Sequence, residues 1–159
     1  MISTLTIADL RNILDSVANP INIDEIRLSQ DLREAVKESK IWAARIASAV
    51  PMKGFDIAFI REKTPREEIE NVVSHVERMG KEIHNDVADF LEYVSRIEML
   101  MNATTIGEGP IRVELEMRLI SLAIKCNSVI NELRRLIAVF IIHSSFKLSE
   151  SLSAPAFPR

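Results

Sequence analysis

Apolar residues recur at intervals of three and four along most of this chain, the spacing of helices that bury one face. A first short helix is predicted between Thr6, a capping residue, and Asn19-Pro20, because the residue before a proline avoids the helical region. Its apolar positions are Ile7, Leu10, Leu14 and Val17.

A second helix is expected to begin after Asn22 or Asp24 and to end before Pro51. Its apolar positions are Leu28, Leu32, Ala35, Val36, Trp42, Ile46 and Val50. Residues 52–63 contain β-leaning residues but no alternating partner run. We interpret them as a loop or a short strand.

A long third helix is predicted after the capping box Thr64-Pro65-Arg66-Glu67, which satisfies two backbone N–H groups at the helix start. Its apolar positions are Ile69, Val72, Val76, Met79, Ile83, Val87, Phe90, Val94, Ile97 and Met101. Gly80 is its expected weak point. Residues 102–110 carry the densest turn chemistry of the chain and end the helix.

A fourth helix is expected to start at Pro110. Its apolar positions are Leu115, Leu119, Leu122, Cys126, Ile130, Leu133 and Ile137. Four helices with short links predict an all-α fold, an antiparallel four-helix bundle. We expect one bundle domain at residues 1–148 and a polar C-terminal tail at residues 149–159.

The run from Leu136 to Ile142 is apolar without interruption. An ordinary amphipathic helix leaves about half of its circumference to water, so this run needs partners on several sides. It either plugs the base of a monomeric bundle or forms a contact between subunits. The candidate interface residues are Leu136, Ile137, Val139, Phe140, Ile141 and Ile142.

Composition narrows the protein class. The 159 residues are 47% hydrophobic and 27% charged, which is typical of a globular domain rather than a disordered tail. A net charge of −3 argues against a surface that attracts nucleic acid everywhere, but it allows a local basic patch. The single Cys126 lies in an apolar pattern and is expected to be a buried thiol. With no signal-type start and no run long enough to span a bilayer, we expect a cytosolic, non-membrane protein.

Catalytic and metal-binding patterns are not found in the sequence. Its three histidines lack the Glu-x-x-His spacing of di-iron bundles, and no phosphate-cradling or nucleophile motif is present. His84, Asp86 and Asp89 could be drawn as a metal cluster, but a solvated helix face is the favoured interpretation. We therefore expect a non-enzymatic protein with no cofactor, no metal and no small-molecule substrate.

Short motifs follow one another along the chain in a distinctive order. They are Ala18-Asn19-Pro20-Ile21, Ser39-Lys40-Ile41-Trp42, Arg96-Ile97-Glu98, Asn102-Ala103-Thr104-Thr105, Arg112-Val113-Glu114, Val129-Ile130-Asn131 and Ser144-Ser145-Phe146. In this order, and in total length, the chain resembles the coat proteins of rod-shaped plant RNA viruses of the tobamovirus type. The predicted second helix is shorter than in that family, the third is longer and the aromatic belt is thin, so the resemblance is that of a distant relative.

The resemblance implies a structural coat protein that self-assembles into a helical rod around single-stranded RNA. It implies a location in the virion and the host cytoplasm, and it makes the run from Leu136 to Ile142 a subunit interface.

By the same resemblance, arginines near the loop between the long helices pair with RNA phosphates. Carried over to this chain, these are Arg112, Arg96 and, from the helix that leads to Trp42, Arg33. The family has a further arginine beside the one that matches Arg96, whereas this chain has Tyr93-Val94-Ser95 there. For each arginine, a solvated helix charge is the alternative.

The family also opposes carboxylates between subunits, so that assembly strengthens in acid. The candidates here are Glu98, Glu108, Glu114 and Glu116. Lys40 stands where the family has a switch carboxylate, so that pair is either missing or replaced by a salt bridge.

Two other classes are compatible with the pattern. The first is a cellular helical module that dimerises or docks a partner helix through the same apolar strip. The second, a membrane-active bundle, is less favoured because basic residues do not gather beside the apolar run.

Overall fold

The computed structural model describes the backbone of residues 19–50 and 67–153, and the side chains of residues 19–50, 74–135 and 138. In these ranges the chain contains helices and connecting segments but no strand, which confirms the all-α class for the described part. The helix predicted at residues 6–18, the loop at 52–63 and the capping box that begins at Thr64 lie outside it.

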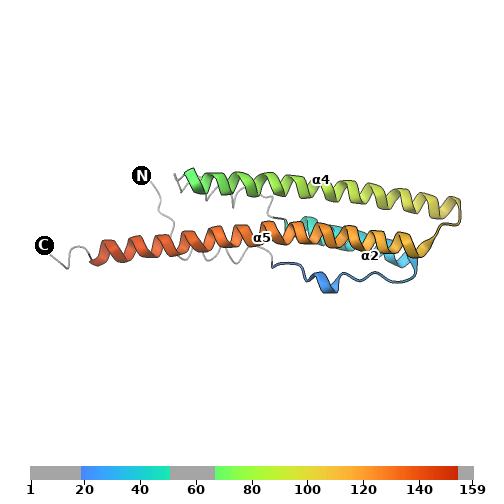
Figure 1. The fold of residues 1–159 in the computed structure, drawn as a ribbon, viewed down its shortest axis with the longest axis horizontal. Helices are drawn as coiled ribbons and strands as arrows, with labels where there is room; N and C mark the ends of the chain where they lie inside the picture. The colour runs from blue at the N-terminus through green and yellow to red at the C-terminus, as the bar shows by residue number, and fades with distance from the viewer. Residues whose placement is uncertain (1–18, 51–66, 154–159) are drawn as a thin grey trace.

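Three long helices and one short turn make up the described fold (Figure 1). They are the 3-10 turn η1 (Ile23–Glu25) and the α-helices α2 (Leu32–Ala49), α4 (Glu67–Ala103) and α5 (Glu108–Ser153). Helices α4 and α5 run antiparallel beside each other, joined by the short turn at residues 104–107 (Figure 1). Helix α2 lies along the half of this hairpin that is next to the turn (Figure 1).

The three helices differ greatly in length. At 1.5 Å per residue, the 18 residues of α2 span about 27 Å, the 37 of α4 about 55 Å and the 46 of α5 about 69 Å. Helix α2 can therefore cover only about half of the α4–α5 hairpin. Helix α5 also continues to Ser153, into residues 149–159 where we expected a polar tail.

The prediction for the start of the second helix was wrong. Asn22 does cap a turn, because its side chain accepts from the Asp24 N–H at 3.1 Å, but that turn is the 3-10 turn η1. The helix itself begins at Leu32, where the Asp31 side chain accepts from the Arg33 N–H at 3.2 Å. A local cap at each of two positions therefore separates one expected helix into a turn and a helix.

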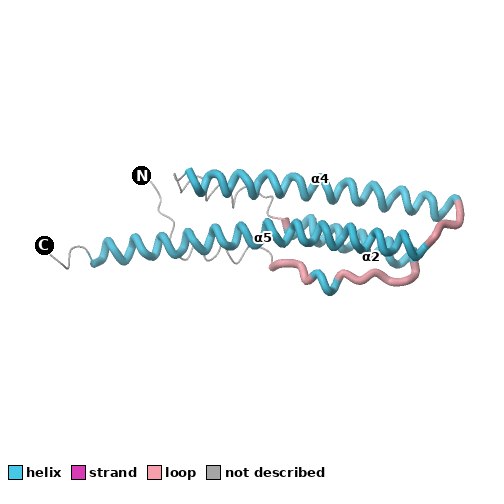
Figure 2. The backbone as a smooth tube through the Cα atoms, viewed as in Figure 1, coloured by secondary structure: helices cyan, strands magenta, loops and turns pink. Residues whose placement is uncertain are grey.

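The segment between these caps runs beside α5 as irregular chain (Figure 2). Ile26 and Leu28 are two residues apart and both are buried, so this segment contributes to the core without being helical. Its ends are held by side chains. Asn127 of α5 accepts from the Ile21 N–H at 2.6 Å and donates to the Ile21 carbonyl at 2.8 Å, while Glu38 of α2 accepts from the Ser29 N–H at 2.8 Å.

The core lies between α2, α4, α5 and this segment, and it is mostly aliphatic. Its largest fully buried side chains are Ile26, Leu32, Ile46, Ile83, Leu115, Leu119, Ile130 and Leu133. Each such side chain stabilises the fold by about 1.5–3 kcal/mol relative to exposure. Cys126 is buried as expected, and burial raises the pKa of its thiol to about 11.

The structure also shows what happens at two positions that the sequence singled out, Gly80 in α4 and Pro110 at the start of α5. Helix α4 passes through Gly80 without a break, because the apolar positions on both sides keep its buried face in register with the core. Helix α5 begins at Glu108, slightly before Pro110. Pro110 then lies in the first turn, where its missing N–H removes no helical hydrogen bond.

Candidate assembly and RNA-binding surfaces

The three arginines proposed for RNA come from three different helices, near the end of the molecule where α4 turns into α5. Arg96 on α4 donates to Glu92 at 2.7 Å, and Arg112 on α5 lies 3.4 Å from Glu116. Both pairs join residues four apart on one helix. Each of these two guanidinium groups therefore already has a carboxylate partner on its own helix.

Arg33 has a different setting. In the described part of the chain its guanidinium has no ion pair, and it lines a hollow of about 210 Å³ between α2 and α4. The other lining residues are Val36, Lys37, Glu98, Met101 and Asn102. Of the three arginines, Arg33 is thus the one whose charge is available to an anion.

The four candidate carboxylates also differ from one another. Glu98 lies 2.6 Å from the Lys40 ammonium, so its carboxylate takes part in a salt bridge between α4 and α2 within the chain. Glu116 lies by Arg112, as above. Glu108, at the start of α5, is exposed and has no ion pair among the described residues. Surface pairs of this kind contribute little to stability, about 0–1 kcal/mol each.

Glu114 belongs to a cluster that crosses from α5 to α4. Tyr93 donates to one carboxylate oxygen at 2.8 Å, and Arg118 donates to the other at 3.0 Å. The Arg118 guanidinium also lies 4.0 Å from the centroid of the Tyr93 ring, which is cation–π geometry. The hydrogen bond from Tyr93, followed by that from Arg118, lowers the pKa of Glu114. Burial, reinforced by the bond to Glu114, raises the pKa of Tyr93.

A polar seam continues from this cluster along α4 and α5. Lys125 bridges Glu82 at 2.8 Å and Asp86 at 2.9 Å, and these two bonds raise the pKa of Lys125. Further along, His75 lies 3.4 Å from Glu132. We did not predict this seam. Its signal is present in the sequence, because residues 82, 86 and 93 on one helix and 114, 118, 125 and 132 on the other flank the apolar stripes at helical spacing.

Asp86 therefore serves an ion pair with Lys125 rather than a cluster with His84 and Asp89. In the part of the chain that the structure describes, no three His, Cys, Asp or Glu side chains gather as metal ligands would. No helix in the described ranges has an apolar stretch long enough to cross a bilayer.

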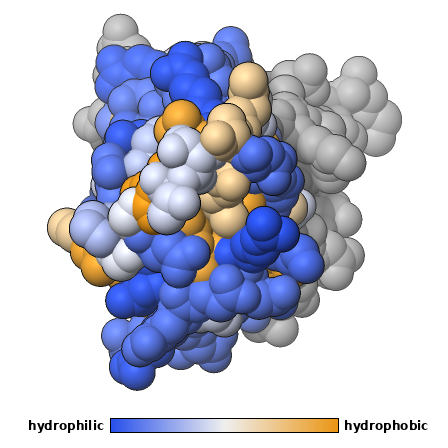
Figure 3. Space-filling view, turned by 90° about the vertical axis from the view of Figure 1, so that its right-hand side faces the viewer, coloured by the Kyte–Doolittle hydropathy of each residue, from blue (hydrophilic) through white to orange (hydrophobic). Residues whose placement is uncertain are grey.

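Large apolar side chains are exposed on several outer faces. They are Ile41, Leu91, Met99, Leu100, Val113, Met117 and Ile124. Met99, Leu100 and Val113 lie near the α4–α5 turn, and a view onto that end shows hydrophobic colour among hydrophilic residues (Figure 3). The predicted interface residues from Leu136 to Ile142 lie in α5, but their side chains, except that of Ala138, are outside the described set.

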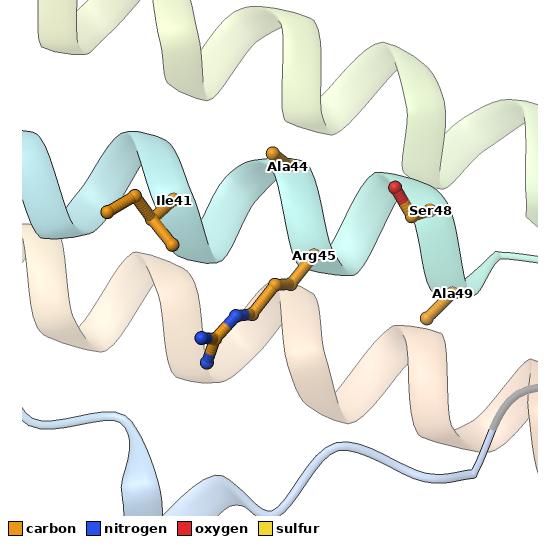
Figure 4. Close-up of a pocket in the computed structure, with 5 residues that line it drawn as sticks. All are labelled: Ile41, Ala44, Arg45, Ser48 and Ala49. Atoms are coloured by element: carbon orange, nitrogen blue, oxygen red, sulfur yellow. The ribbon is translucent and has the colours of Figure 1, made fainter.

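The outer side of α2 carries a second, shallow hollow of about 520 Å³. Ile41, Ala44, Arg45, Ser48 and Ala49 line it (Figure 4). The Arg45 side chain points back along the helix, and its guanidinium carbon lies 4.9 Å from the centroid of the Trp42 ring. Small side chains and one cation already engaged with an aromatic ring offer few groups that could orient a small ligand.

No protein-family model, curated protein or solved structure matches this chain.

Proposed function

We propose that this chain is a non-enzymatic structural protein that assembles with copies of itself, as a coat that forms a helical rod around single-stranded RNA. In this proposal the helix predicted at residues 6–18 completes an antiparallel four-helix bundle like that of the tobamovirus coat proteins, and the chain occurs in virions and in the host cytoplasm. The observation that carries the proposal is the set of large apolar side chains exposed on α4 and α5.

Exposed apolar area supports self-association because isolated apolar residues on a surface are ordinary, whereas groups of them mark contact surfaces. Met99 is 71% exposed and Met117 is 66% exposed, although each lies on a helix with a well-formed buried face. Packing against a second subunit removes this area from water at about 25 cal/mol per Å². The elongated hairpin suits a rod, in which each subunit is covered by neighbours along its length.

For RNA, the proposal places a phosphate in the hollow beside Arg33. Lys37, which also pairs with Glu34 at 3.4 Å, and Asn102 line the same hollow, as does Glu98, whose carboxylate pairs with Lys40. Arg96 and Arg112 take part only by exchanging Glu92 and Glu116 for phosphates. Each such exchange returns a carboxylate to water, so their contribution to affinity is smaller than that of Arg33.

Of the four candidate carboxylates for a pH-dependent contact between subunits, only Glu108 remains in this proposal. Glu98, Glu114 and Glu116 each have a cationic or hydroxyl partner within the chain. Opposed Glu108 side chains of neighbouring subunits repel each other when both are ionised. We expect light scattering by the assembled protein to increase as pH falls from about 8 to about 5.5. Scattering that stays constant over this interval argues against the switch.

Negative-stain microscopy of the purified chain, with and without single-stranded RNA, tests the coat proposal. We expect discs or rods, which lengthen when RNA is added. Arg33→Ala is expected to reduce RNA-dependent lengthening more than Arg96→Ala, which serves as the matched control on a paired arginine. Small uniform particles under both conditions contradict the coat.

The second candidate is a cellular module that dimerises or docks a partner helix without RNA. The pairing of Arg96 and Arg112 with carboxylates of their own helices favours this candidate, since such pairs leave little net positive charge for phosphates. Filter binding with labelled RNA separates the two. Retention that falls steeply with salt supports the coat, and no retention at low salt supports the module.

A further inference from the structure

The segment before α2 is tied to α5 at two points, and the order of these points gives its direction. Asn127 holds Ile21 by hydrogen bonds of 2.6 and 2.8 Å. Arg134, about two turns further along α5, donates to the Asn19 side chain at 3.1 Å. Going back along the chain from Ile21 to Asn19 therefore means going forward along α5. The chain that precedes Asn19 starts beside Arg134 and, continued in the same direction, follows α5 toward Ser153.

The part of α5 past Arg134 extends beyond α2 and begins with the uninterrupted apolar run of residues 136–142 (Figure 1). Helix α2 does not reach this run. The Cys126 thiol donates to the Ile46 carbonyl at 3.7 Å, and α2 ends three residues later at Ala49. Because the run is apolar on every side of the helix, its contact with α4 covers only one side of it.

Residues 6–18 have the pattern and the length of a segment that covers a second side. Their apolar positions share one predicted helix face and are Ile7, Leu10, Leu14 and Val17. From Ile7 to Val17 this face is about 15 Å long, which is also the length of α5 from Leu136 to Phe146. A helix this short is marginal by itself in water, so its apolar face needs a surface to bind.

We propose that residues 6–18 bind as a helix antiparallel to α5 past Arg134 and cover one side of the run of residues 136–142. Val17 then lies at the level of Leu136, and Ile7 lies at the level of Phe146. Residues 51–66 have a different task, because they connect the end of α2 to the start of α4. The proposed function uses a helix at residues 6–18 without placing it. This inference places it, and it depends on the two attachments to α5 rather than on assembly or RNA.

Paramagnetic relaxation in NMR spectra of the full chain tests the placement. Asp9→Cys carries a nitroxide label at a position opposite the predicted apolar face. Cys126 stays unlabelled at neutral pH, because it is buried and its thiol pKa is raised to about 11. We expect the label to broaden the amide signals of residues 136–150 and to leave those of residues 112–122 sharp. Sharp signals throughout residues 136–150 overturn the placement.

Two further samples identify the segment that covers the run. In a mixture of labelled chain and unlabelled ¹⁵N chain, broadening arises only between copies. Broadening of residues 136–150 as strong in the mixture as in the single sample shows that a second copy covers the run, and it overturns the proposal. A label at Lys53→Cys that broadens these signals, when the label at Asp9→Cys does not, assigns the cover to residues 51–66 and also overturns it.

A pair of charge insertions tests the contact by hydrogen exchange. Leu14→Glu puts a carboxylate on the apolar face of residues 6–18, whereas Ser16→Glu puts the same group on the opposite face. We expect exchange at the α5 amides of residues 136–146 to accelerate about tenfold or more in Leu14→Glu and to stay unchanged in Ser16→Glu. Unchanged exchange around Leu119 shows that the core is intact in both variants. Equal exchange at residues 136–146 in the two variants contradicts the contact.

The coat and this placement can fail separately, because these measurements use dilute chain without RNA. If Asp9→Cys broadens residues 136–150 and microscopy shows no discs or rods, the coat proposal fails and the placement stands. If rods form while Asp9→Cys broadens no signal of α5, the placement fails and the coat stands.

Discussion

Glu114 links two helices through a single carboxylate. It accepts from Tyr93 on α4 and from Arg118 on its own helix, and both bonds favour its ionised form. A carboxyl group whose pKa is lower in the folded state than in the unfolded state stabilises the fold above its ordinary pKa. That stabilisation is lost as pH falls through the folded pKa. The cluster therefore weakens in acid, below the ordinary value of 4.5.

Tyr93→Phe tests this coupling. Without the hydroxyl, the pKa of Glu114 is expected to rise toward 4.5, because the bond from Tyr93 is the main cause of its lowering. We expect the variant to unfold more easily than the parent at pH 7, with the difference shrinking as pH falls below 4.5. NMR titration of the glutamate side chains measures the pKa, and urea unfolding measures the stability. A Glu114 pKa that does not change in Tyr93→Phe contradicts the assignment.

At alkaline pH the polar seam between α4 and α5 weakens because two of its groups, Tyr93 and Lys125, lose their protons. The pKa values of Tyr93 and Lys125 are raised in the fold, so each group contributes stability that is present below its ordinary pKa of 10.0 or 10.5. This contribution is lost as pH rises through the folded values. Lys125→Met is therefore expected to make the unfolding free energy less sensitive to pH above 10.5 than it is in the parent. Equal alkaline slopes for the two proteins would show that Lys125 is not responsible.

Lys40 offers a third prediction at the level of single residues. Its ammonium is 2.6 Å from Glu98, so Lys40→Glu creates a carboxylate pair between α2 and α4. Repulsion raises the pKa of one carboxyl group, which makes the variant less stable at neutral pH and restores stability as acid protonates the pair. Lys40→Gln, which only removes the ion pair, is the control. A Lys40→Glu variant whose stability follows that of Lys40→Gln from pH 7 to about 4 refutes the prediction.

Individual side-chain partners were predictable only in part. The burial of Cys126 followed from its position in an apolar row. The polar seam was missed, although its residues flank the apolar stripes at regular spacing. Spacing shows which side chains share a face, but the partner across the interface depends on the register of α4 against α5, which the turn at residues 104–107 sets.

Among the elements, the segment before α2 behaves differently from the helices. It reaches the core through Ile26 and Leu28 without being a helix, and Asn127 holds its first part by two hydrogen bonds to Ile21. Sequence reasoning assigned Leu28 to the second helix because its position fits helical spacing, and it did not single out Ile26. The side chains of Asn22 and Asp31 instead cap the turn η1 and helix α2 separately, because each accepts a hydrogen bond from a nearby backbone N–H. The long helices were easier to predict. Their many apolar residues at helical spacing stabilise the helix more than a single glycine such as Gly80 weakens it.

Asn127→Ala tests how the segment is held. The half-buried Ile21 N–H then loses its acceptor, and we expect a loss of about 1–3 kcal/mol in unfolding free energy. Hydrogen exchange at the Ile21 amide is expected to accelerate more than exchange at core amides of α5. Asn131→Ala, at an exposed position one turn further along α5, is the matched control and is expected to be neutral. Unchanged exchange at Ile21 in Asn127→Ala would rule out the clamp.

At the scale of the molecule, the all-α class of the described residues and the antiparallel α4–α5 hairpin followed from periodicity and from the turn chemistry at residues 102–110. The exposure of further apolar residues on α5, outside its buried face, could not be predicted from the sequence. A one-dimensional pattern shows the main buried face of α5, but which of its other apolar residues stay exposed becomes visible only when the positions of α2 and α4 are known. Met117 and Ile124 are exposed to water in a single subunit, and this exposure supports the proposed self-association.

Sedimentation velocity of the unaltered chain, from about 1 µM to several hundred µM at neutral and mildly acidic pH, tests this account most directly. We predict a sedimentation coefficient that rises with concentration, first to that of a dimer and then, in acid, to larger assemblies. A single boundary of an 18.0 kDa species at every concentration and pH would contradict the account.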